Sequence, residues 1–165
     1  MSAMAENGEN LRELYRELIL DHARSPRHFG KLDGMTHFAE GINPLCGDKL
    51  RIYFRVGVDE TIEEARFEGT GCAISVASAS LLTDTVTGMP VSEALTWFSA
   101  IVHRLAGQDS QPGENTAERP QIADIGKLRA LEGVKEFPSR VKCATLAWHA
   151  MNTALRQLDN TATTE

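Results

Sequence analysis

Leu50-Arg51-Ile52-Tyr53-Phe54-Arg55-Val56 is the stretch of sequence that decides the fold. Its apolar residues stand at every second position and alternate with Arg51, Tyr53 and Arg55, which is the period of a half-buried β-strand. Val58-Asp59-Glu60 then offers a turn, and residues 61–68 are the expected returning strand. The stretch therefore predicts an antiparallel hairpin as the start of a sheet.

Helices are predicted on both sides of this hairpin. Leu11, Leu14, Leu18 and Ile19 recur at helical spacing, and Pro26 requires this first helix, over residues 11–22, to stop before it. After the hairpin we expect helices over residues 73–87, over 92–105, near Leu128 and Leu131, and from Cys143 to residue 158. Strands grouped early and helices grouped late indicate an α+β fold, with a small antiparallel sheet of about three strands covered on one face by helices.

Length and charge restrict the class of protein. The 165 residues suit one domain over 1–165, and we expect flexible ends over 1–9 and 159–165 and an exposed loop over 108–119. The formal net charge of −6 argues against nucleic acid as a partner, because binding to phosphates rests on clustered Lys and Arg. No apolar run approaches the roughly 18 residues of a membrane span, and no leader precedes the domain, so we predict a cytoplasmic protein.

The three cysteines lie where the chain is expected to turn. They are Cys46 in Asn43-Pro44-Leu45-Cys46-Gly47-Asp48, Cys72 in Gly69-Thr70-Gly71-Cys72, and Cys143 in Arg140-Val141-Lys142-Cys143. An odd number of cysteines in a domain of this size indicates free thiols in a reducing compartment and no disulfide framework. The thiols are therefore free for metal binding or for sulfur chemistry.

Cys46, Asp48, Cys72 and Cys143 make a complete ligand set for zinc or ferrous iron. Cys46 and Asp48 stand two residues apart, and Gly47 permits a turn that brings both onto one ion. We expect Cys72 and Cys143 each to open a helix, with Arg140 and Lys142 adding positive charge, which favours the thiolate. A carboxylate is a more easily displaced ligand than a thiolate, so the set suggests exchange rather than a purely structural site.

The cysteines and histidines also admit other interpretations. Each cysteine alone also fits a small buried apolar residue. The five histidines show no ligand spacing and fit helix-end or surface positions, with His28 in an irregular loop. The sequence contains no Gly-x-Ser-x-Gly elbow, no phosphate-binding Gly-Lys-Ser/Thr loop and no zinc-deaminase signature, which argues against acyl transfer, phosphoryl transfer and deamination.

Three motifs in order carry a family resemblance. They are Leu45-Cys46-Gly47-Asp48, Gly71-Cys72-Ala73-Ile74-Ser75 and Lys142-Cys143-Ala144-Thr145-Leu146-Ala147-Trp148. The chain thereby resembles the iron-sulfur cluster assembly proteins of the IscU/NifU family from about Leu11 to Leu155. Two departures from the classical scaffolds favour the SufU branch: Lys142 stands where they carry His, and residues 107–137 hold an additional stretch that we interpret as a SufU-type insertion.

The resemblance implies a zinc ion held by Cys46, Asp48, Cys72 and Cys143, with Arg140 and Lys142 as supporting residues. It further implies a zinc-dependent sulfurtransferase in which Cys46 is the catalytic residue. Cys46 would accept persulfide sulfur from a SufS-type cysteine desulfurase and pass it to downstream iron-sulfur assembly proteins. The residues by themselves equally allow Cys143 to react first, because Lys142 and Arg140 adjoin it.

Two other functions fit the same residues. The cysteines and Asp48 could hold a [2Fe-2S] cluster on a scaffold that delivers it to other proteins, although Lys142 in place of His removes one candidate iron ligand. The zinc could also be purely structural, in which case chelation would unfold the protein and no desulfurase would respond.

Overall fold

An antiparallel sheet forms one layer of the computed structural model, in which residues 3–106, 125–135, 137–157 and 161–163 are described. Its main strands are β1 (His37–Asn43), β2 (Asp48–Val56) and β3 (Ile62–Thr70), and β2 lies between the other two. β2 includes the predicted strand and begins two residues before it, whereas β3 begins one residue later and ends two residues later than the predicted returning strand. The prediction of an α+β fold with a small antiparallel sheet is thereby confirmed.

β1 was not located from the sequence, for a clear physical reason. The residues that β1 buries include Ala39, Gly41 and Asn43, which are small or polar. Phe38 and Ile42, which would carry an apolar signal, lie at the alternate positions. Hydrophobic periodicity therefore does not identify this strand, although its pairing with β2 is regular from end to end.

The structure differs from the predictions at both ends of the chain. The first helix, α1 (Ala3–Arg24), includes most of the segment 1–9 that we expected to be flexible. The segment 159–165, also expected to be flexible, contains the short strand β4 (Thr161–Thr163), which pairs parallel with β1 and adds a fourth strand to the sheet. Residues 107–124 and 136 of the predicted insertion, with the loop expected over 108–119, lie outside the described residues.

The described part of the chain contains five helical segments, which pack on one side of the sheet or beside it. After α1 come α2 (Ala73–Val86), α3 (Val91–Ala106), the 3₁₀ helix η2 (Gly126–Val134) and α4 (Pro138–Leu155). The predicted helices over 73–87, over 92–105 and near Leu128 are confirmed. The last helix begins earlier than predicted, because Pro138 occupies a position in the first turn where proline is well tolerated. No described helix is long and apolar enough to cross a membrane.

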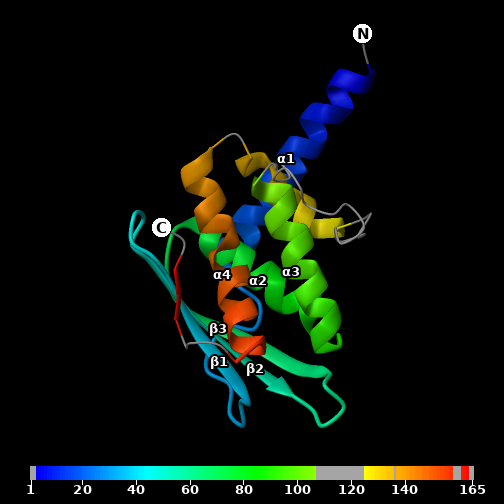
Figure 1. The fold of residues 1–165 in the computed structure, drawn as a ribbon. Helices are drawn as coiled ribbons and strands as arrows, with labels where there is room; N and C mark the ends of the chain where they lie inside the picture. Colours follow the sequence, from blue (N-terminus) through cyan, green and yellow to red (C-terminus); the bar gives the residue numbers. More distant parts are fainter. Residues whose placement is uncertain (1–2, 107–124, 136, 158–160, 164–165) are drawn as a thin grey trace, which may run out of the picture.

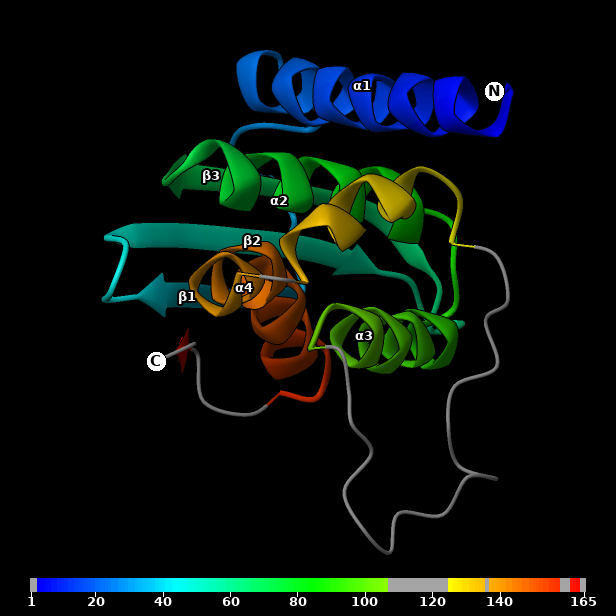
Figure 2. The same ribbon diagram turned by 90° about the horizontal axis from the view of Figure 1, so that it is seen from above.

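The helices form layers over one face of the sheet (Figures 1 and 2). α4 lies across β1 and β2, α2 lies against β3, and α1 packs on α2. The core between sheet and helices holds Leu50, Ile52 and Phe54 from the inner side of β2 together with Trp148 from α4. Lys49 and Arg51 at the alternate positions of β2 are exposed, so one face of the sheet is covered, as predicted.

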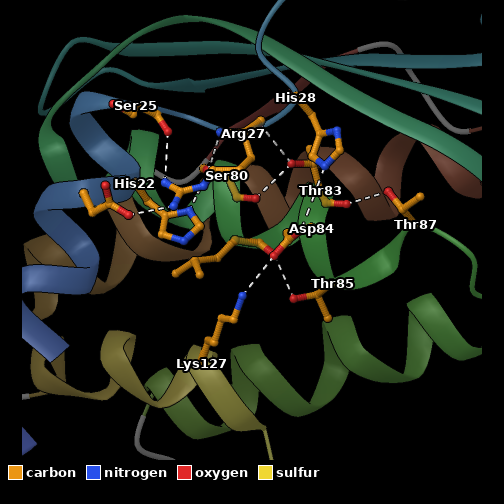
Figure 3. Close-up of polar contacts among 12 residues, drawn as sticks. His22, Ser25, Arg27, His28, Ser80, Thr83, Asp84, Thr85, Thr87 and Lys127 are labelled. Atoms are coloured by element: carbon orange, nitrogen blue, oxygen red, sulfur yellow. Dashed lines mark hydrogen bonds and ion pairs between the residues drawn. The ribbon is translucent and has the colours of Figure 1, made fainter. Parts of the chain in front are cut away.

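A polar network fastens α1 to α2 (Figure 3). His22 is 1% exposed, and its Nδ1 lies 2.7 Å from the Oγ of Ser80 on α2. The backbone N–H of Arg27 donates to the same Oγ at 2.8 Å. On the next turn of α2, Asp84 pairs with Lys127 of η2 at 3.3 Å. α1 and η2, which border the candidate site below, are thus held to one helix. His22 lies in the last turn of α1, a helix-end position as expected, and is buried there.

The buried His22 predicts a loss of stability in mild acid. Burial, reinforced by the positive charge of Arg27, lowers the pKa of His22 below its usual value near 6.5. Between the lowered pKa and about 6.5, His22 is protonated in the unfolded chain but not in the folded chain. The free energy of unfolding should therefore decline as the pH falls below about 6.5. In urea titrations, His22→Gln should flatten this decline between neutral pH and the lowered pKa.

The matched control for this prediction is His103→Gln, on the partly exposed side of α3. It should leave the pH dependence of the wild type in place. Equal slopes for wild type and His22→Gln would contradict the prediction.

Candidate metal centre

The first two site residues lie at the turn between β1 and β2. The backbone N–H groups of Cys46 and Gly47 donate to the carbonyl of Asn43 at 3.2 and 2.9 Å, which closes the turn. Gly47 has a φ of +73°, a left-handed conformation that a residue with a Cβ rarely adopts. The turn exposes Cys46, while Asp48, as the first residue of β2, points into the protein and is 1% exposed.

Cys143 reaches this turn from α4. Its sulfur, the Cys46 sulfur and a carboxylate oxygen of Asp48 all lie within 4.8 Å of one another. The Cys143 Sγ donates to the Cys46 Sγ at 3.4 Å, although 97 residues separate them in sequence. The predicted convergence of these three residues is therefore present, with Cys143 buried at 2% exposure and Cys46 open to solvent.

Cys72 lies beside this group and is joined to it through its backbone. It caps the start of α2, as predicted, and its backbone N–H donates to Asp48 Oδ1 at 2.8 Å. Its sulfur is exposed and lies 3.6 Å from the Oγ of Ser75. The preceding Gly71 permits this approach, since a Cβ there would lie 2.5 Å from Ser75 Oγ and 2.9 Å from Asp48 Oδ1. The structure thus brings Cys72 to the edge of the three-residue group.

The expected thiolate at Cys143 requires a correction. Cys143 does not open a helix, because α4 begins at Pro138, more than one helical turn before it. The effect of the helix dipole falls off within the first turn. Burial, with the neighbouring Cys46 and Asp48 next in effect, instead raises the pKa of the Cys143 thiol well above its usual range. In the protein alone, Cys143 is held as the neutral thiol.

The donor set fits a divalent cation. Asp48 Oδ2 is buried and has no hydrogen-bond partner among the described residues, an arrangement that costs free energy unless a cation or donor faces it. Sulfur and carboxylate donors within one small group suit zinc or ferrous iron, and a bound cation would favour the deprotonated Cys143 sulfur. The residues present therefore fit the metal that the sequence predicted.

The two supporting residues take different positions on the first turns of α4. Arg140 is exposed, and its guanidinium lies 4.9 Å from the centre of the Phe137 ring. Together with Cys46, Cys72 and Cys143 it lines a cavity of about 630 Å³. Lys142 is half-buried and is not among the residues that line this cavity. Of the two, Arg140 is therefore the better placed to contact a molecule bound beside the cysteines.

Asn43 is a site residue that the sequence analysis missed. Its Nδ2 donates to Cys143 Sγ at 3.6 Å, its side chain is fully buried, and its Oδ1 has no partner among the described residues. The available sequence signal was an amide at the head of the Cys46 motif. In the structure, this amide lies on the buried face of β1. A buried amide needs a partner, and only the fold shows that this partner is a sulfur 100 residues away.

Comparisons with known proteins agree on one family. The model of the NifU-like N-terminal domain matches residues 14–144. The zinc-dependent sulfurtransferase SufU of Bacillus subtilis (strain 168) is 38% identical over 142 residues, which cover 86% of this chain and 89% of SufU. The iron-sulfur cluster assembly scaffold protein IscU of Streptococcus pyogenes serotype M1 is 37% identical over 150 residues, covering 91% of this chain and 87% of IscU. IscU of Thermotoga maritima is 39% identical over 148 residues, covering 88% and 94%.

Solved structures show the same fold. The crystal structure of FiSufU from Fervidobacterium islandicum AW-1, described as an iron-sulfur cluster assembly scaffold for the SUF system, superimposes with a TM-score of 0.72 at 31% identity. The match covers 84% of this chain and 94% of FiSufU. The N-terminal part of a NifU-like protein from Brucella abortus gives a TM-score of 0.70 at 21% identity, covering 90% and 96% of the two chains.

Proposed function

This chain belongs to the NifU-like N-terminal domain family of iron-sulfur cluster assembly proteins, and from that premise we propose that it is a zinc-dependent sulfurtransferase. In this proposal Cys46 accepts persulfide sulfur from a cysteine desulfurase of the SufS type. The sulfur then passes to downstream iron-sulfur assembly proteins. Support comes from the similarity to SufU of Bacillus subtilis, which is named as a zinc-dependent sulfurtransferase.

The unequal exposure of the clustered groups carries the proposal. Asp48 and Cys143 are 1% and 2% exposed, whereas Cys46 lies on an exposed turn of the same group. A protein-borne persulfide can reach Cys46 without opening the fold, but it cannot reach the Cys143 sulfur in this way. Asp48 and Cys143 are thus placed to hold a metal, and Cys46 and Cys72 are the cysteines that a partner can reach; Cys46 is the one of these two that lies in the three-residue group.

The residues that would hold zinc are Cys46, Asp48, Cys72 and Cys143. Bound zinc would keep their sulfurs deprotonated at neutral pH. In the transfer step, the Cys46 thiolate attacks the terminal sulfur of the desulfurase persulfide. A new S–S bond forms at Cys46, the old one breaks, and the electron pair leaves on the desulfurase cysteine as thiolate. Asp48 keeps Cys72 in place by accepting its backbone N–H.

The test of this function is the release of alanine from cysteine by the cognate desulfurase. Adding the zinc-loaded protein should raise the rate strongly, because the acceptor clears the persulfide from the enzyme after each turnover. No increase in the rate would count against sulfur transfer and in favour of the scaffold or of a structural zinc site.

A [2Fe-2S] scaffold is the second candidate function. It is favoured by the two IscU relatives, which are named as scaffold proteins, and by the three cysteines, which line one cavity. Here the cluster would be cargo held by the cysteines with Asp48 as the fourth ligand. Anaerobic reconstitution with iron and sulfide should then give a stable cluster spectrum and transfer to an apo-ferredoxin, and failure to form the cluster would exclude this candidate.

Asn43 provides a prediction about metal affinity. Because its amide donates to the Cys143 sulfur, Asn43→Ala should leave that ligand without its fixed hydrogen bond. Loss of such an outer contact typically weakens metal binding by about 10- to 100-fold. Competition with a chromophoric zinc chelator would measure the change.

Asn152→Ala supplies the matched control, since Asn152 lies on α4 and its Oδ1 accepts a hydrogen bond from Arg156, the residue that caps this helix. It should keep the zinc affinity of the wild type. An unchanged affinity in Asn43→Ala would show that the contact to sulfur has no part in metal binding.

A further inference from the structure

The cavity beside the cysteines has features that metal binding does not use. Its volume of about 630 Å³ is far larger than one ion requires and lies within the range of small-molecule sites. Its wall is built from α1, the start of α2, η2 and the start of α4, and these elements contact one another. The apolar part of the lining consists of Ile19, Leu20, Ile74, Leu131 and Val134.

Apart from the cysteines, the charged side chains that line this cavity are cationic. Arg16 of α1 and Arg140 of α4 both line it, and the described lining residues include no carboxylate side chain. Ser139 adds a hydroxyl at the first turn of α4. The cavity is therefore built to attract negative charge toward the cysteines.

We propose that this cavity binds low-molecular-weight sulfur compounds that carry a carboxylate. The carboxylate would pair with Arg16 and Arg140, the short carbon chain would lie on the apolar wall, and the sulfur would meet Cys46. Arg140 is suited to this role because its stacking on Phe137 limits its freedom before the ligand arrives. The two arginines are then binding residues that select the charge of the sulfur compound.

The chemistry rests on the proposed sulfurtransferase function and extends its range of acceptors. A small thiolate in the cavity attacks the outer sulfur of a persulfide on Cys46. One S–S bond forms on the small molecule, the S–S bond at Cys46 breaks, and the electron pair returns to Cys46 as thiolate. The exchange needs no oxidant or reductant. The protein would thus hand sulfur to a diffusible carrier as well as to a protein.

Thiol–disulfide exchange tests the site without any desulfurase. The reagents are dithiodipropionate, 2-hydroxyethyl disulfide and cystamine, three small disulfides whose end groups are anionic, neutral and cationic. The Cys46 mixed disulfide is followed by mass spectrometry with the full-length protein. Dividing each variant's rate by the wild-type rate with the same disulfide removes differences between leaving groups.

Arg16→Gln and Arg140→Gln should each slow the reaction with the anionic disulfide by roughly 2- to 5-fold, as expected for loss of a partly exposed ion pair. The neutral disulfide should react at the wild-type rate, and the cationic one at that rate or faster. Arg16→Lys should restore most of the anionic rate. Arg24→Gln, an exposed arginine of α1 outside the cavity lining, should change nothing.

Equal changes with all three disulfides, or no change in either cavity variant, would overturn the proposal. A cavity that accepts only a peptide segment of a protein partner predicts this second result. The test separates this inference from the proposed function. Charge selection without stimulation of the desulfurase would reject the sulfurtransferase and keep the binding site. Stimulation of the desulfurase without charge selection would reject the binding site alone. Thermal unfolding of each variant confirms that it has folded.

Discussion

Cys46→Ser is expected to abolish acceptance of persulfide sulfur and to return alanine release by the desulfurase to the rate seen without added protein. Serine keeps the size of the side chain and the exposed turn, but a hydroxyl at neutral pH is a far weaker nucleophile than a thiolate toward sulfur. The readouts are the desulfurase rate and the mass of the protein, which should lack the added sulfur atom.

The position of the buried cysteine explains why this effect should belong to Cys46. Cys143 is 2% exposed, so it has no access to a persulfide carried by another protein. Cys143→Ser should therefore act mainly through loss of metal, and excess zinc should restore part of its activity. Added sulfur found on Cys143 or Cys72 in the Cys46→Ser variant would show that another cysteine is the acceptor.

Asp48→Asn is expected to remove most of the stabilisation that zinc gives to the folded protein. In the wild type, zinc at 1,000 times its dissociation constant should add about 4 kcal/mol to the free energy of unfolding. The asparagine Oδ1 keeps the acceptor for the Cys72 N–H, but the neutral amide is a much poorer ligand. Most of the stabilisation by zinc should therefore be lost in the variant.

Without metal, Asp48→Asn should not be less stable than the wild type. Asp48 Oδ2 is buried without a partner among the described residues, which costs about 1–3 kcal/mol. Asp48→Asn replaces the unpartnered oxygen with an NH2 group that can donate to the neighbouring sulfurs, so the metal-free variant should be at least as stable as the metal-free wild type. Urea titrations with and without a chelator measure all four values. A variant that is equally destabilised in both states would show that Asp48 is needed for the fold itself and not for a cation.

The outer parts of the site could be predicted from the local sequence. Cys46 and Asp48 could be placed together because Gly47 alone lies between them, and Gly47 has the left-handed φ that such a turn requires. Cys72 was placed at a helix start by its glycine-bounded turn, and it does cap α2. In both cases the information lies within a few residues, where backbone stereochemistry determines the outcome.

The inner parts of the site required contacts between distant segments. β1 buries small and polar residues, so its sequence carries no strand period, yet it provides Asn43. The start of α4 was placed five residues too late, which gave Cys143 the wrong electrostatic environment. Arg16 lines the cavity only because α1 is held on α2 through His22 and Ser80.

By itself, the sequence determined the α+β class, the turns that present Cys46 and Cys72, and the presence of sulfur and carboxylate groups at these turns. These follow from periodicity, glycine positions and side-chain chemistry, which act over short distances along the chain. Only the tertiary structure decided which groups meet, which of them is exposed, and where the cationic cavity opens. The packing of α4 on β1 buries Cys143 beside Cys46 and raises the pKa of its thiol, and burial of this kind depends on residues far apart in the chain.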